Sequence, residues 1–102
     1  TDDYARFCRM MANGGSLDGN TILEPETIEL MQQDHLKNIK RTYGLGGWAD
    51  GSGTYYWGGA AGTKFWVSTP DKAFGLFMVQ RTGYETPAEK VFQRLSRRAL
   101  EN

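Results

Sequence analysis

Residues 64–80 read KFWVSTPDKAFGLFMVQ, and this run predicts a β-hairpin. Its two arms, Lys64–Ser68 and 73–80, are rich in β-branched and aromatic residues, and the sequence between them is Thr69-Pro70-Asp71-Lys72. Proline stands at the second position of this turn, where its fixed φ angle suits the backbone of a type I or type II turn. We therefore expect two antiparallel strands joined by a tight turn.

The residues before the hairpin indicate where the sheet begins. Segment 43–49 is aromatic and glycine-rich, and Asp50-Gly51-Ser52-Gly53 has the composition of a turn. Strands are expected at 43–50, 54–68 and 73–81. Together they would form a three-stranded antiparallel sheet.

Two helices are predicted before the sheet. In the first, apolar residues recur at the spacing of one helical face: Tyr4, Phe7, Cys8 and Met11. Asn13-Gly14-Gly15 ends this helix, because glycine readily adopts the left-handed conformation that follows many helices. The second helix begins at Pro25, a residue suited to the first helical position, and we expect it to bury Ile28 and Met31.

A third helix is predicted at the end of the chain. Thr86-Pro87-Ala88-Glu89 has the pattern of a capping box, with proline at the first helical position. An apolar stripe follows it: Ala88, Val91, Phe92, Leu95 and Ala99. We expect this helix to pack on one face of the sheet. The predicted fold class is therefore α+β, with all residues 1–102 in one domain.

Composition excludes several classes of function. Twelve Lys and Arg balance twelve Asp and Glu, which argues against a nucleic-acid-binding arm or a polybasic membrane patch. The longest mainly apolar run, 73–79, is too short to span a bilayer. Cys8 is the single cysteine, so no internal disulfide or cysteine-based zinc site is possible, and no metal or cofactor is expected. Because the chain does not begin with Met, we expect a piece of a longer protein.

Residues 55–63 read YYWGGAAGT and call for a closer interpretation. Glycines weaken a strand unless another group approaches the backbone closely. One interpretation is a bulged strand or a long hairpin turn. The other is an edge strand that lines a ligand groove, with main-chain N–H groups open to a substrate oxygen, as in an oxyanion hole.

Several blocks of the sequence resemble, in the same order, the C-terminal part of serine β-lactamase-like proteins. They are DYARF (3–7), NGG (13–15), LDG (17–19), ILEPET (22–27), YGLG (43–46), WGGAAGT (57–63), FWV (65–67), PD (70–71) and GLFMVQ (75–80). The most similar branch is the esterases related to class C β-lactamases and penicillin-binding proteins. The resemblance covers nearly the whole chain and implies the C-terminal part of the β-lactamase/transpeptidase-like fold.

The resemblance implies roles for four residues. Members of this family carry three sequence boxes, and Trp57-Gly58-Gly59 resembles the third, Lys-Thr-Gly, in its esterase-like form. Trp57 stands where many members have a lysine, which puts strong binding of a β-lactam carboxylate in doubt. Trp57, Gly58 and Gly59 would line the groove for the acyl group of a small ester or amide. Ala60 would donate its backbone N–H to the oxyanion.

The other two boxes are absent from the sequence. No serine is followed three residues later by lysine, and no tyrosine is followed two residues later by Asn or Ser. Arg81-Thr82-Gly83 resembles Lys-Thr-Gly only by coincidence, because it follows the last strand. Nucleophilic catalysis needs a hydroxyl and a base within hydrogen-bond reach. The resemblance therefore implies a C-terminal fragment that is inactive alone and needs a nucleophile-bearing N-terminal portion.

Two alternatives remain open at this point. The chain could be a stand-alone truncated module, which would form a homo-oligomer or bind a partner through an exposed sheet edge. It could also be an independent small esterase that uses Ser52 or Ser68 with His35. Against that idea, we expect His35 to have a surface or capping role, and Cys8 to be a buried, inert thiol.

Overall fold

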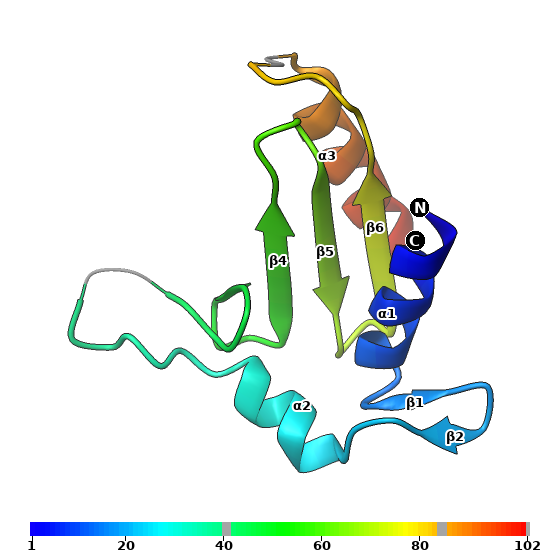
Figure 1. The fold of residues 1–102 in the computed structure, drawn as a ribbon, viewed down its shortest axis with the longest axis vertical. Helices are drawn as coiled ribbons and strands as arrows, with labels where there is room; N and C mark the ends of the chain where they lie inside the picture. Colours follow the sequence, from blue (N-terminus) through cyan, green and yellow to red (C-terminus); the bar gives the residue numbers. More distant parts are fainter. Residues whose placement is uncertain (40–41, 84–85, 102) are drawn as a thin grey trace.

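The computed structural model describes residues 1–39, 42–83 and 86–101 (Figure 1). Its elements follow the chain in this order: α1 (Asp2–Ala12), β1 (Ser16–Leu17), β2 (Asn20–Thr21), α2 (Pro25–Met31), β3 (Trp48–Ala49), β4 (Thr54–Gly58), β5 (Lys64–Ser68), β6 (Ala73–Phe77) and α3 (Ala88–Leu100). The prediction of an α+β fold with two helices before the sheet and one after it is confirmed.

The main sheet is antiparallel throughout, in the order β3-β4-β5-β6. Its register pairs Trp57 with Phe65, and Gly58 with Lys64. β6 forms one edge of the sheet, and β3, only two residues long, forms the other. The expected hairpin turn is present between β5 and β6, where the Lys72 N–H donates to the Thr69 carbonyl at 3.2 Å.

The predicted three-stranded sheet is wrong in its strand count, because the expected strand 54–68 is two strands. A turn at residues 59–63 separates β4 from β5. The expected strand 43–50 shortens to β3, because the Leu45 N–H donates to the Met31 carbonyl (3.0 Å) and the Gly44 N–H to the Gly47 carbonyl (2.8 Å) instead of to a strand. The expected strand 73–81 ends at Phe77.

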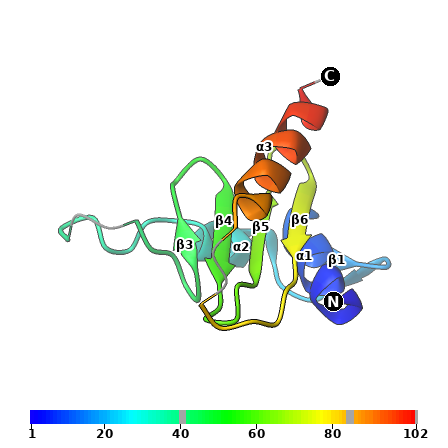
Figure 2. The ribbon, with the colours of Figure 1, turned by 90° about the horizontal axis from the view of Figure 1, so that it is seen from above.

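The helices lie on both sides of the sheet. Figure 2 shows α1 and α3 on opposite faces. α1 packs against β5 and β6, as the spacing of its apolar residues predicts. The buried core lies on this face and consists of Cys8, Met10, Met11, Ala12, Ile28, Ala49, Tyr55, Phe65 and Val67. α2 lies at one end of the sheet (Figure 1), where Gln32 and Thr69 exchange side-chain hydrogen bonds at 2.7 and 3.1 Å.

α3 covers the second face only in part. The Phe92 ring lies 6.0 Å from the Phe77 ring, and the Arg97 guanidinium lies 5.9 Å from the centre of the Trp66 ring. No described residue of α3 is buried, however, and Leu95 of the predicted stripe is 55% exposed. The helix begins at Ala88, whose N–H donates to the Thr86 hydroxyl at 3.4 Å. None of the helices in residues 1–39, 42–83 and 86–101 is long and apolar enough to cross a membrane.

Candidate functional site

The candidate site lies at the turn between β4 and β5. The Gly59 N–H donates to the Thr63 carbonyl at 2.9 Å, and the Gly62 N–H donates to the Gly59 carbonyl at 3.0 Å. Gly62 has a φ of 84°, in the left-handed region. This is the three-residue hairpin loop in which a type I turn is followed by a left-handed glycine. Of the glycines in this segment, Gly62 is therefore the one that the turn itself requires.

The turn leaves one backbone donor available at its first central position. Within the part of the chain that the structure describes, the Ala60 N–H makes no backbone hydrogen bond, and Ala60 is exposed. The neighbouring Ala61 carbonyl accepts a hydrogen bond from the Arg81 N–H at 3.0 Å, which ties the turn to the segment after β6. A tethered turn with a free N–H has the geometry of a preorganised donor for an anionic oxygen.

The outer edge of β4 is open beside this turn. β3 pairs only with Tyr55 and Tyr56, so no strand among the described residues pairs with this edge from Trp57 onward. The backbone groups of successive residues in a strand point alternately to its two sides. The Gly59 N–H points toward β5, so the N–H and carbonyl of Gly58 point to the open edge. An extended ligand could therefore pair with Gly58 and reach the Ala60 N–H.

Trp57 has its side chain on the opposite face of the sheet from α3. Its ring is 39% exposed and lies 5.8 Å from the Tyr43 ring and 6.2 Å from the Trp48 ring. These two neighbours fix the orientation of the indole. Its cross-strand partner Phe65 is buried, so Trp57 extends the apolar face of the sheet outward to solvent.

A cavity of about 250 Å³ adjoins this edge. It is lined by Tyr4, Trp57, Gly58, Gly59, Thr63, Lys64, Phe65 and Met78. The structure thus brings together Trp57, Gly58 and Gly59 of the predicted site, and Ala60 follows them directly in the turn. Tyr4 comes from α1, where its position on an apolar helical face had suggested only a core role.

Lys64 is a second residue that sequence reasoning missed. Its side chain lies against Gly58, where an added Cβ would be 2.7 Å from Lys64 Cδ and 2.8 Å from Lys64 Nζ. The absence of a side chain at Gly58 therefore makes room for the lysine. The length of the hairpin loop could have revealed this pair, because a three-residue loop at 60–62 sets Gly58 opposite Lys64.

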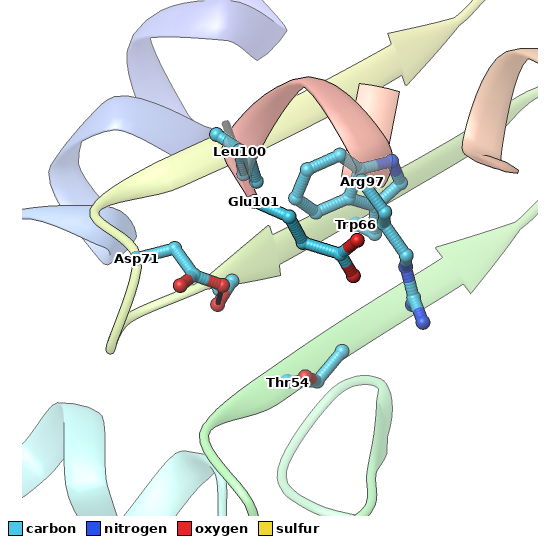
Figure 3. A pocket seen from close by; sticks show the side chains of 7 residues that line it. Thr54, Trp66, Asp71, Arg97, Leu100 and Glu101 are labelled. Carbon is cyan, nitrogen blue, oxygen red and sulfur yellow. Dashed lines mark hydrogen bonds between the residues drawn. The ribbon is translucent and has the colours of Figure 1, made fainter. Parts of the chain in front are cut away.

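A second cavity, of about 350 Å³, lies between α3 and the other face of the sheet (Figure 3). It is lined by Thr54, Trp66, Ser68, Asp71, Arg97, Leu100 and Glu101, of which only Ser68 was considered as a site residue from the sequence. The Ser68 hydroxyl donates to Asp71 at 2.6 Å. The cavity contains charges of both signs and adjoins the partly covered face of α3, so we regard it as space left by incomplete packing.

The structure does not bring His35 to either candidate serine. His35 Nε2 lies 2.7 Å from the Leu30 carbonyl at the end of α2, which is the capping role expected from the sequence. The Ser52 hydroxyl donates to Asp50 at 2.6 Å, and Ser68 is bonded to Asp71. A nucleophile activated by His35 would need a hydrogen bond that these partners replace. Among the described residues no group of three or more His, Cys, Asp or Glu side chains could hold a metal ion.

Cys8 is fully buried, and burial raises the pKa of its thiol to about 12. The nucleophilic form of cysteine is the thiolate. The thiol therefore stays protonated at neutral pH, as the sequence predicts for a buried, inert cysteine.

Comparison with known proteins supports the fold. A crystal structure of a putative β-lactamase from Bacteroides dorei superimposes with a TM-score of 0.78 at 24% sequence identity, over 99% of this chain and 40% of that one. No family model matches the sequence. Two curated proteins of Mycobacterium tuberculosis, Protein Rv1367c and Uncharacterized protein MT1414, are each 32% identical over 75 residues.

Those 75 residues are 74% of this chain but 14% of each mycobacterial protein. The chain thus spans a small part of the length of the curated relatives it matches, and less than half of the solved structure. The expected resemblance in fold is confirmed along nearly the whole chain. The chain has the fold of part of a β-lactamase-like protein.

Proposed function

We propose that this chain is the C-terminal portion of a serine β-lactamase-like hydrolase of esterase type, of the branch related to class C β-lactamases and penicillin-binding proteins. In this proposal it supplies the oxyanion-hole strand of the enzyme. The observation that carries the proposal is the unpaired Ala60 N–H beside the open edge of β4. The β-lactamase-like fold gives it a structural context.

In the complete enzyme the reaction is acyl transfer from a small ester or amide to a serine. The serine oxygen attacks the carbonyl carbon, and the serine proton passes to a lysine of the Ser-x-x-Lys box. The carbonyl oxygen becomes an oxyanion, which the Ala60 N–H and the N–H of the serine itself stabilise. Collapse of the intermediate expels the alcohol or amine with a proton, and water then releases the acid.

The chain contributes one side of this site. Trp57 forms a wall of the groove, while Gly58 and Gly59 let the substrate approach the strand closely. The sequence holds no Ser-x-x-Lys, so the nucleophile comes from an N-terminal portion and the chain alone does not turn over substrate. Removal of one oxyanion-hole donor typically lowers kcat by about 10²–10³.

Two measurements on the 102-residue chain test this proposal. Intact mass after incubation with a fluorophosphonate probe should show no adduct, and a nitrophenyl ester should not be hydrolysed. Titration of ¹⁵N-labelled chain with methylphosphonate, a small oxyanion mimic, should shift the Ala60 amide more than the amide of Ala99, an exposed residue near the C-terminal end of α3. A stoichiometric adduct, or an Ala60 amide that does not respond, would contradict the proposal.

A second candidate function is a self-assembling module. It is favoured by β6, which lies at the sheet edge and belongs to a run without charged residues from position 73 to position 80. Such edges pair readily with other strands unless a charge or proline blocks them. In this case light scattering should give at least a dimer mass, and Val79→Lys should return the chain to a monomer while the control Val91→Lys on α3 does not. A monomer at millimolar concentration would exclude this function.

A further inference from the structure

We propose that the cavity beside Trp57 binds the aryl group of an arylcarboxylic acid or its ester, and that Tyr4 selects this class of ligand. The inference rests on the proposed acyl-transfer function and deepens it by naming the acyl group. It concerns the 250 Å³ cavity between the first turn of α1 and the ends of β4 and β5.

The walls of this cavity are aromatic. Tyr4, Trp57 and Phe65 line it together with the flexible thioether side chain of Met78. The Tyr4 ring lies 5.0 Å from the Phe65 ring at an interplanar angle of 49°. Aromatic rings attract one another in tilted and offset arrangements at such separations, so these walls favour an aromatic guest over an alkyl chain of equal size.

The cavity is large enough for such a guest. An apolar cavity of about 150 Å³ accepts benzene. At about 250 Å³, this one has room for a phenyl ring and a one- or two-carbon linker. The linker would lead toward Gly58 and Gly59, which border both the cavity and the turn that carries Ala60.

The one charged side chain beside the cavity points away from it. Among the described lining residues only Lys64 is charged, and its ammonium group lies against Gly58, on the face of the sheet opposite Trp57 and Phe65. The cavity therefore recognises the aryl ring and not a charge.

Tyr4 acts here as a wall and not as a base. Burial raises the pKa of its hydroxyl above the usual value, and the nearby Cys8 raises it further. The phenol therefore stays neutral at pH 7, where a general base would need a lowered pKa. Its ring packs between the cavity and Phe7, at 5.7 Å from the Phe7 ring, so that α1 contributes directly to the site.

Binding of phenylacetate to the whole chain, followed by NMR, tests the proposal. Phenylacetate should bind at least tenfold more tightly than acetate, which lacks the ring, and more tightly than cyclohexylacetate, whose ring is aliphatic. The indole N–H signal of Trp57, assigned with Trp57→Phe, should move most. Equal affinities for phenylacetate and acetate, or tighter binding of cyclohexylacetate, would overturn the proposal.

Variants test the aromatic wall and the cavity itself. Tyr4→Phe keeps the ring and should bind phenylacetate as before, while Tyr4→Ala should weaken binding about tenfold. Met78→Phe fills the cavity and should block binding without removing a packed ring from the core. Phe92→Ala, which removes an aromatic ring of α3 on the other face of the sheet, is the matched control and should have no effect.

Lys64→Gln should leave phenylacetate binding unchanged, because the Lys64 ammonium group lies on the other face of the sheet. If neither Tyr4→Ala nor Met78→Phe changes binding, the cavity is not the site. The methylphosphonate titration separates a failure of the aryl-binding proposal from a failure of the proposed oxyanion-hole function. A response of Ala60 to methylphosphonate without phenylacetate binding would refute only the aryl pocket, while the reverse would refute only the oxyanion role.

Discussion

Gly75→Ala should destabilise the protein through a single overlap in the sheet. Gly75 pairs with Trp66 across β5 and β6, and a Cβ added at this position would lie 2.3 Å from Trp66 Nε1 and 2.6 Å from Trp66 Cε2. Favourable carbon contacts occur at about 3.5–4.0 Å, so one of the two groups must move by about 1 Å. The indole is 3% exposed, and a shift toward the 350 Å³ cavity that it lines would relieve part of the overlap.

Overpacking of this kind costs about 1–3 kcal/mol, and the gain from replacing glycine in a strand offsets about 0.5 kcal/mol of it. We therefore expect the free energy of unfolding to fall by about 0.5–2.5 kcal/mol. For a domain of this size that lowers Tm by about 2–20 °C. Urea unfolding followed by circular dichroism would measure the change.

Two further variants make this test specific. Gly58→Ala is the matched control in the same sheet, because its new methyl group would meet only the end of the exposed Lys64 side chain, and its stability should change by less than about 0.5 kcal/mol. Trp66→Phe removes the clashing ring atoms and also Nε1, a buried donor without a partner among the described atoms. The double variant Trp66→Phe/Gly75→Ala should therefore show little additional loss beyond Trp66→Phe alone. An unchanged midpoint for Gly75→Ala, or additive losses in the double variant, would refute the reasoning.

Two other predictions concern buried hydroxyl and thiol groups. Tyr55→Phe removes the hydrogen bond from the Tyr55 hydroxyl to the Leu45 carbonyl (2.8 Å), and urea unfolding should show a loss of about 1 kcal/mol; no loss would mean that water replaces the bond fully. Burial raises the pKa of Cys8 from 9.0 to about 12, so the folded state holds this proton more tightly than the unfolded state, and stability should be complete below pH 9 and decline as the pH rises toward 12. Cys8→Ala should make that decline shallower, and Ellman's reagent should label Cys8 only on unfolding; rapid labelling of the native protein would contradict its burial.

The parts of the fold that the sequence predicted are those specified by local chemistry. Pro70 in the Thr69–Lys72 turn predicts the β5–β6 hairpin, and Gly14 and Gly15, with φ angles of 71° and 108°, end α1 as expected. The strand count was wrong because Gly58, Gly59 and Gly62 look alike in sequence. Only Gly62 adopts a left-handed φ, and this property depends on the pairing of the two flanking strands.

The candidate site also has residues that local sequence reveals and residues that only tertiary packing brings together. Trp57, Gly58 and Gly59 are contiguous, so a local motif brought them to attention, and the structure places them on one cavity. Tyr4 lies more than fifty residues away in sequence, and its helical spacing is equally consistent with a core residue. Its place beside Trp57 depends on how α1 packs across β5 and β6, which no local pattern encodes.

The hydrogen bond from the Arg81 N–H to the Ala61 carbonyl has a mechanical consequence. Arg81 follows β6 on the route to α3, so the backbone that leads to the last helix is attached to the turn that carries Ala60. This bond holds the peptide between Ala61 and Gly62 against the segment after β6, so it limits how the turn can deform. The main chain that leaves the sheet therefore helps to hold the candidate oxyanion donor in place.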